Sequence, residues 1–194
     1  MSTLFVGDVH ACADELGALV DQASPSRVIL LGDVFNKGPK PFQTWDLVQQ
    51  IGAECVLGNH DLHVIAQAAE GQHLVPSGAV AWLKALPLYL QGAGWVAVHG
   101  GIDPVAGPDG TTEVQAANMR RFPMDDPAAD FWWRQYSGPP LVLYGHDAVR
   151  GLQDHRPHTL GLDTGCVYGG RLTGYLLEAD RILSVPARAA YKPV

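Results

Sequence analysis

The sequence predicts an α/β fold in which short buried strands alternate with helices, and two observations support this fold class. Five apolar runs of strand length each end at once in a glycine or polar turn: LFVGDVH, VILLGDV, CVLGNHD, WVAVHGG and LVLYGHD. Stretches with helical periodicity separate these runs. At 194 residues and 47% hydrophobic content the chain is long enough for one sizeable core, so we expect a single domain over residues 1–194.

The stretches with helical character are residues 13–23, 41–51, 60–71, 77–86 and 111–122. Pro39 and Pro41 stand where a proline can open a helix. After residue 158 the pattern changes to closely spaced strands without helices, at 159–163, 171–179 and 181–187, with a hairpin turn at Asp180. This change predicts mixed sheets instead of an all-parallel sheet. Apolar residues between 62 and 90 predict either core or a small helical cap over the cleft.

Charge and composition exclude several classes of partner. The chain has 13 basic and 20 acidic residues and a net charge of −7, with no basic run that could neutralise a phosphate backbone or an anionic membrane. The N-terminus has no basic leader, and its apolar stretch is too short for a signal peptide or a membrane span. We therefore expect a mature, soluble, cytoplasmic protein that binds neither duplex nucleic acid nor membranes. The three cysteines form no CxxC pair and are expected to be buried free thiols.

Polar side chains gather directly after the five apolar runs, and together they predict a metal site. In open α/β sheets the loops beyond the carboxyl ends of the strands converge on one crevice. A lone histidine there is more often a hydrogen-bonded cap than a ligand. Polar side chains that follow five separate strands, however, together favour one shared site. Clustered carboxylates in a poorly hydrated cleft cannot all stay ionised without a cation. Oxygen and imidazole ligands without thiolate suit manganese, iron, zinc or a comparable ion. The residues concerned are Asp8, His10, Asp33, Asn59, His60, His99 and His146.

The motifs GDVH, GDVFNKGP, LGNHDLH, VHGG and YGH, in this order, resemble those of the calcineurin-like metallophosphoesterases of the phosphoprotein phosphatase family. GNHDLH, WLKALPL and LDTGCVYGGRLTG resemble most the symmetrical diadenosine tetraphosphatases and their bacterial serine/threonine phosphatase relatives. The resemblance covers residues 4 to about 185, nearly the whole chain. It implies two mixed β-sheets packed as a sandwich with helices outside.

The resemblance also implies a role for each of these residues. Two divalent ions are expected, manganese first, with iron, zinc, nickel or cobalt as alternatives. Asp8 and His10 would bind one ion, and Asp33 would bridge to a second ion held by Asn59, His99 and His146. Two such ions activate a shared water for in-line attack on phosphorus. The nucleophile would be the hydroxide that bridges them.

Four residues complete the predicted site. By the same resemblance, His60 would protonate the leaving group. Lys37 and Arg134 would hold the phosphoryl oxygens, and Asn59 would also contact the substrate. Two of these have a structural alternative, because Lys37 could be a solvated lysine and Arg134 could stack on a tryptophan. Asn36 and Lys37 stand where protein phosphatases of this family carry aspartate and arginine, so His60 would gain only a neutral hydrogen bond.

The favoured function is a phosphohydrolase that cleaves a dinucleoside polyphosphate, diadenosine tetraphosphate giving two ADP. The alternatives are a serine/threonine protein phosphatase or broad phosphomonoesterase with the same site, and a module that binds a phosphorylated partner without hydrolysis. The substrate is thus a phosphorylated small molecule or a phosphoprotein. Asp61 and Asp147 could each orient a histidine or cap a helix or turn.

Overall fold

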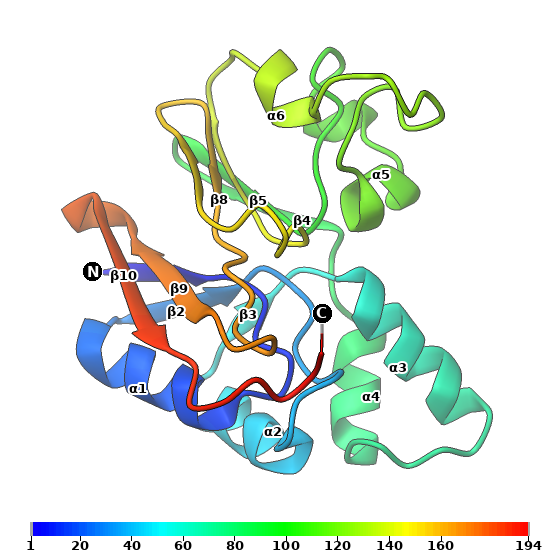
Figure 1. Ribbon diagram of the computed structural model, residues 1–194, viewed down its shortest axis with the longest axis vertical. Coiled ribbons are helices and arrows are strands. Elements are labelled where there is room, and N and C mark those ends of the chain that lie inside the picture. Colours follow the sequence, from blue (N-terminus) through cyan, green and yellow to red (C-terminus); the bar gives the residue numbers. More distant parts are fainter. Residues whose placement is uncertain (1, 194) are drawn as a thin grey trace.

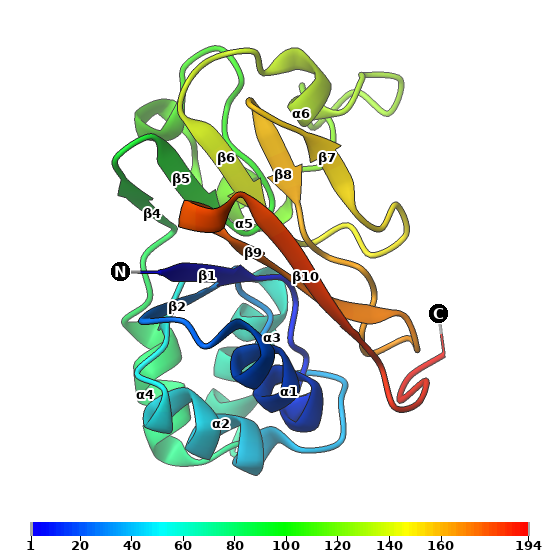
Figure 2. The same ribbon diagram turned by 90° about the vertical axis from the view of Figure 1, so that its left-hand side faces the viewer.

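The computed structural model describes residues 2–193, which form two five-stranded sheets packed face to face (Figures 1 and 2). The first sheet has the order β10-β9-β1-β2-β3, and the second has the order β4-β5-β6-β8-β7. Strands β1, β2 and β3 are parallel, as are β5, β6 and β8, whereas β4, β7, β9 and β10 pair antiparallel to their neighbours. Both sheets are therefore mixed, which confirms the predicted fold class.

The strands of the first sheet are β1 (Thr3–Val6), β2 (Arg27–Leu30), β3 (Glu54–Cys55), β9 (Arg171–Leu176) and β10 (Arg181–Pro186). Those of the second are β4 (Tyr89–Gly92), β5 (Trp95–Val98), β6 (Leu141–Tyr144), β7 (Gln153–His155) and β8 (Thr159–Gly161). The predicted hairpin is present, because β9 and β10 pair antiparallel through η2 (Leu177–Ala179) and Asp180, which has a left-handed φ of 47°.

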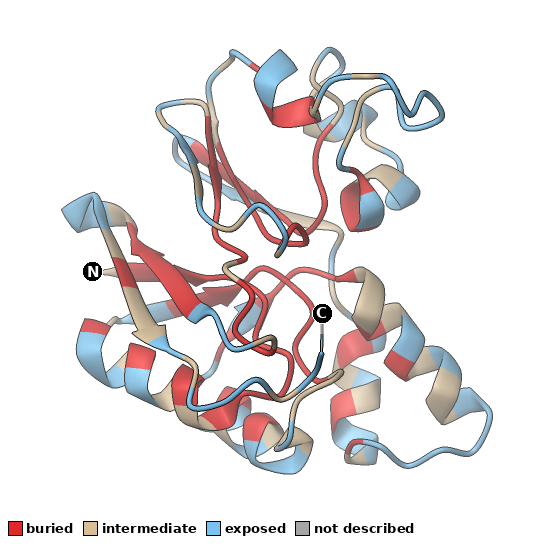
Figure 3. Cartoon of the chain, viewed as in Figure 1, coloured by how far each residue is buried: buried red, intermediate tan, exposed pale blue. Residues whose placement is uncertain are grey.

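Side chains alternate between two buried faces along each central strand, as the period of two requires. In β1, Phe5 points into the core between the sheets, whereas Leu4 and Val6 point to the core beneath the helices. In β5, Ala97 lies between the sheets and Val98 faces the opposite core. Burial on both faces explains why these segments appear in the sequence as continuous apolar runs, and the strands form the buried centre of Figure 3.

Helices cover the outer faces of the sandwich. The first sheet is covered by α1 (Ala13–Ala23), α2 (Pro41–Gln50), α3 (Asn59–Ala69) and α4 (Ser77–Lys84), and the second by α5 (Glu113–Asn118) and α6 (Trp132–Gln135) (Figure 1). The 3-10 turn η1 (Pro108–Gly110) has no buried residue. All five predicted helices are found. The last of them is shorter than predicted, because Thr112 and Gln115 form a capping box that starts it late and Met119 is extended.

The segment expected to form a cap at 62–90 contains most of α3 and all of α4. Val64, Ala79 and Leu83 of these helices are buried in the core beneath the first sheet. Within residues 2–193, none of the side chains that line the cavity at the ends of the parallel strands comes from 62–90. Part of this segment therefore packs in the core beneath the first sheet, and a cap formed by it stays a prediction. No helix in the described part of the chain is both long and apolar enough to span a bilayer.

Candidate metal centre

The predicted metal ligands lie together where the parallel strands of both sheets end. Asp8 and His10 follow β1, Asp33 follows β2, Asn59 begins α3 after β3, His99 follows β5 and His146 follows β6. All are buried except Asn59, which is partly exposed. Four of them line one cavity of about 530 Å³, namely Asp8, His10, Asp33 and His146, and this volume is within the size range of pockets that hold small molecules. Strand direction thus gathers residues from positions 8 to 146 at one edge of the sandwich.

Asp33 lies between two groups of potential ligands. Its Oδ2 is 3.6 Å from Nε2 of His10, and its Oδ1 is 3.4 Å from Nε2 of His99. On the first side, Nε2 of His10 is also 3.9 Å from Oδ2 of Asp8. The two oxygens of one carboxylate therefore face different neighbours, and ligand atoms of Asp8, His10 and Asp33 all lie within 4.8 Å of one another.

On the other side of Asp33, two imidazoles converge on the side-chain oxygen of Asn59. Nε2 of His99 is 2.9 Å and Nδ1 of His146 is 3.0 Å from Oδ1 of Asn59. The remaining ring nitrogens are 2.7 Å from the Leu31 carbonyl and 3.1 Å from the Asn118 carbonyl, respectively. Both nitrogens of each ring therefore face an oxygen, and a neutral imidazole carries one proton. A metal bound at the nitrogens near Asn59 would leave the protons on the nitrogens that face the backbone carbonyls.

The electrostatics of this cluster favour a bound cation. Burial, followed by the charges of Asp163 and Asp33, raises the pKa of Asp8 well above its usual value, and burial raises the pKa of Asp33 to about 7. Burial also lowers the pKa of His10 and of His99, and it lowers that of His146 to about 2. Charged carboxylates beside neutral imidazoles are the forms that a divalent ion stabilises. The donor set therefore fits a hard or borderline divalent metal.

Two glycines of the motifs are required by close packing around the carboxylates. A Cβ on Gly58 would overlap Oδ1 of Asp33, and a Cβ on Gly145 would overlap Oδ1 of Asp8. His10, Asp33 and His146 themselves have positive φ values of 45°, 54° and 71°. Non-glycine residues rarely adopt this conformation, and its concentration here is typical of functional sites.

Asp61 fixes the position of the Asp33 loop. Its side chain is fully buried, and its two oxygens accept the backbone N–H groups of Asp33 at 2.8 Å, Val34 at 2.9 Å and Gly58 at 3.0 Å. Asp61 therefore caps α3 and supports a predicted ligand through the backbone. Asp147 instead binds Arg150 through both oxygens, at 2.8 and 2.9 Å.

His60 lies at the cavity beside Asn36. The Asn36 amide nitrogen is 3.1 Å from Nδ1 of His60, and since an amide nitrogen only donates, Nδ1 is the acceptor and the ring proton sits on Nε2. Burial and then the Lys37 charge lower the pKa of His60 to about 4. The Lys37 ammonium group donates to the Tyr168 hydroxyl at 2.8 Å and lies 3.5 Å from His10 Nε2. Lys37 is thus part of the cavity wall and not a solvated loop residue.

Arg134, predicted to hold phosphate, points away from the cavity. It lies on the exposed surface of α6, where it pairs with Asp130 at 3.2 Å and stacks over Phe131. The cavity arginine is Arg120, whose Nη2 donates to the His146 carbonyl at 2.9 Å. No sequence pattern indicated Arg120, because this residue follows a helix and not a strand.

Asp163 is a second cavity residue, which the family resemblance places near the site and which we expected to be a structural turn residue. It is 5% exposed and lies in the cavity wall beside Asp8. A signal for it was present, since Asp163 directly follows the apolar run of β8 in the same way that the ligands follow their strands.

Comparisons with known proteins agree with this architecture. The family described as calcineurin-like phosphoesterase matches residues 1–183. The symmetrical bis(5'-nucleosyl)-tetraphosphatase of Aromatoleum aromaticum is 27% identical, with 96% of this chain and 97% of the relative aligned. The enzyme of the same name from Vibrio campbellii is 29% identical, covering 96% and 99% of the two chains.

Both alignments are longer than this chain. They extend over 270 and 268 positions, whereas the chain has 194 residues. The two relatives therefore contain internal segments with no counterpart here.

A crystal structure of a candidate diadenosine tetraphosphatase superposes with a TM-score of 0.87 at 30% identity. The superposition covers 96% of this chain and 93% of that one. The chain therefore belongs to the calcineurin-like metallophosphoesterases, a family of phosphoester-hydrolysing enzymes, as the order of its motifs indicated.

Proposed function

We propose that this chain is a dinuclear metal-dependent phosphohydrolase whose substrates are dinucleoside polyphosphates. The observation that carries the proposal is the position of Asp33, whose two oxygens face His10 on one side and His99 on the other. In this assignment Asp8 and His10 would hold the first ion, Asn59, His99 and His146 would hold the second, and Asp33 would contribute to both. When bound, two such cations supply Lewis-acid charge and an activated water.

The protein groups around this centre would position the substrate. Arg120 and Lys37 are cationic side chains that line the cavity close to the predicted ligands His146 and His10, and we assign the phosphoryl oxygens to them. This replaces the earlier assignment of Arg134. Asn59 is also close enough to the centre to contact substrate. His60 would donate the proton on Nε2 toward the leaving oxygen, since its Nδ1 accepts from Asn36.

Three facts support a dinucleoside polyphosphate as substrate. The curated relatives in the comparison are named symmetrical tetraphosphatases. Asn36 cannot stabilise an imidazolium as an aspartate would, which favours substrates with good leaving groups. The cavity is far larger than one phosphoryl group requires. Manganese as the metal and the cytoplasm as the compartment remain predictions.

The test is product analysis with purified protein in manganese. Diadenosine tetraphosphate that gives only ADP supports the proposal, whereas ATP plus AMP would show asymmetric cleavage. No turnover of this compound, together with rapid dephosphorylation of a phosphopeptide or of p-nitrophenyl phosphate, would favour the protein phosphatase or phosphomonoesterase alternative. Bound metal without turnover of any of these would favour a phospho-ligand binding module. Asp33→Ala serves as the inactive control.

A further inference from the structure

The C-terminal strap, defined as residues 187–193, forms part of the cavity wall. After β10 the chain passes α1 and turns upward before it ends (Figure 1). The backbone N–H groups of Tyr191 and Lys192 donate to the Val167 carbonyl at 2.9 and 3.1 Å, and Ala187 donates to the Gly170 carbonyl at 2.9 Å. Lys192 and Pro193 line the cavity. Backbone pairing therefore fixes where the side chain of Lys192 starts.

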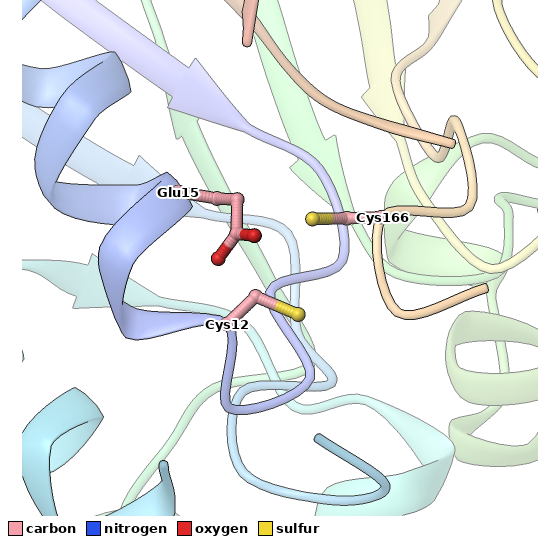
Figure 4. Close-up of side chains that lie close together, drawn as sticks. All are labelled: Cys12, Glu15 and Cys166. Carbon is pink, nitrogen blue, oxygen red and sulfur yellow. The ribbon is translucent and has the colours of Figure 1, made fainter. Parts of the chain in front are cut away.

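Glu15 of α1 anchors the strap from beneath. It is 2% exposed, and its Oε1 accepts the Arg188 backbone N–H and the Tyr191 hydroxyl, each at 2.8 Å. Figure 4 shows its carboxylate beside the thiols of Cys12 and Cys166, and ligand atoms of the three residues lie within 4.8 Å of one another. That spacing could hold a metal ion, but Oε1 of Glu15 is already bonded twice to the strap, so we assign this carboxylate to holding the strap.

Across the loop 164–170, the strap faces the turn after His146, which forms a second exposed part of the cavity wall. Gly169 of this loop packs against Ala190 of the strap, and Gly165 packs against Ala148 of the turn after His146. Val149 of that turn lines the cavity although the residue is 84% exposed. The cavity thus has a buried inner part at the metal ligands and an outer part between Lys192 and Val149.

Charge is distributed unevenly between the two parts. The carboxylates that line the cavity, Asp8, Asp33 and Asp163, are all buried in the inner part. Lys192 lines the outer part, and within the described chain its ammonium group has no ion-pair partner. An exposed cation at the mouth of a pocket attracts an anion that extends out of that pocket.

We propose that Lys192 binds a phosphate of a polyphosphate chain beyond the phosphate at the metal centre, and so selects polyphosphate substrates over phosphomonoesters. This inference rests on the proposed function, because it assumes a phosphoryl group at the inner part. A phosphomonoester ends there, whereas a polyphosphate chain continues past Tyr168 toward the strap. Tyr191 and Glu15 are positioning residues that hold Lys192 in place.

The first test compares Lys192→Ala with the unmodified protein on two substrates, diadenosine tetraphosphate and p-nitrophenyl phosphate. Loss of one exposed charge pair should raise KM for the tetraphosphate about two- to fivefold more than KM for the monoester. Lys192→Arg keeps the charge and should restore the ratio. Tyr191→Phe loses one anchor and should give a smaller change of the same kind. An equal change on both substrates, or none, would overturn the proposal.

Lys84→Ala is the matched control, because Lys84 is an exposed lysine on α4 that lines none of the cavity. A binding measurement separates this proposal from the substrate assignment. Calorimetry at constant excess manganese would compare tripolyphosphate with orthophosphate. Weaker tripolyphosphate binding by Lys192→Ala, with orthophosphate binding less affected, supports the outer site even if diadenosine tetraphosphate is not cleaved. Equal binding of tripolyphosphate by both proteins would exclude it.

Discussion

The Asp61 carboxylate accepts the backbone N–H of Asp33, with 2.8 Å between Oδ2 of Asp61 and the Asp33 nitrogen. Through two further N–H groups, the same side chain holds Val34 and Gly58. One buried carboxylate therefore ties the loop after β2 to the start of α3, and both segments carry residues of the candidate centre.

Replacement of Asp61 by asparagine should destabilise the metal-free protein. An amide offers one acceptor oxygen in place of two, so a buried N–H is left without a partner at a cost of about 1–3 kcal/mol. Urea unfolding in chelator measures this difference. Asp46→Asn, an exposed change on α2, is the control, and an unfolding free energy equal to that of the control would contradict the role of Asp61.

Two glycine-to-alanine variants should have opposite effects. Gly145→Ala places a Cβ against Oδ1 of Asp8, so it should lower both stability and metal content. Gly17→Ala lies in α1, where the nearest atom to the new Cβ is 3.8 Å away, and it should stabilise the fold by about 0.5–1 kcal/mol. Thermal unfolding and metal analysis of the pair measure both effects. If Gly145→Ala kept its metal, the close approach to Asp8 would be unimportant.

Metal stoichiometry tests the bridging role of Asp33. We expect two manganese ions per chain, reduced to one by His10→Ala because that variant removes a ligand from one side only. Asp33→Ala should weaken both ions. Saturating manganese should also stabilise the unmodified protein, by about 2.7 kcal/mol at 100 times Kd. Isothermal titration and elemental analysis provide the counts, and one ion per unmodified chain would rule out a dinuclear centre.

Variants of Arg120 and Arg134 test the structure against the sequence prediction, because each assigns phosphate binding to a different arginine. Arg120→Ala should lower kcat/KM about 10- to 100-fold, the magnitude of a lost charge-assisted hydrogen bond to phosphate. Arg134→Ala should have little effect, since its side chain is exposed and pairs with Asp130. Steady-state kinetics on one substrate measures both. The reverse order would restore Arg134 as the phosphate-binding residue.

The His60→Asn variant should keep its metals, and its loss of activity should be larger for substrates with poorer leaving groups. Loss of a proton donor costs about 10²–10⁴-fold on a poor leaving group, and the loss should be smaller on p-nitrophenyl phosphate. Full activity on an alkyl phosphate would remove His60 from the mechanism.

The regular part of the fold was predictable because buried strands and helices need apolar residues at fixed spacings, and these spacings can be recognised in a short stretch of sequence. Central strands such as β1 and β6 are apolar runs, and α1 was predicted with its observed bounds, Ala13–Ala23. The edge strands β4 and β7 were not predicted. β7 has the sequence QDH, with no apolar residue, and it forms only because β8 offers a free edge.

The sequence by itself determined the family and which residues could serve as ligands, because strands place the residues that follow them at a common edge. Tertiary structure decided which other groups reach that edge. It brings Arg120 to His146 across 26 residues and the Tyr191 hydroxyl to Glu15 across 176, and it turns Arg134 outward. The physical reason is that these positions depend on how distant segments pack, and no local pattern of polarity records that packing.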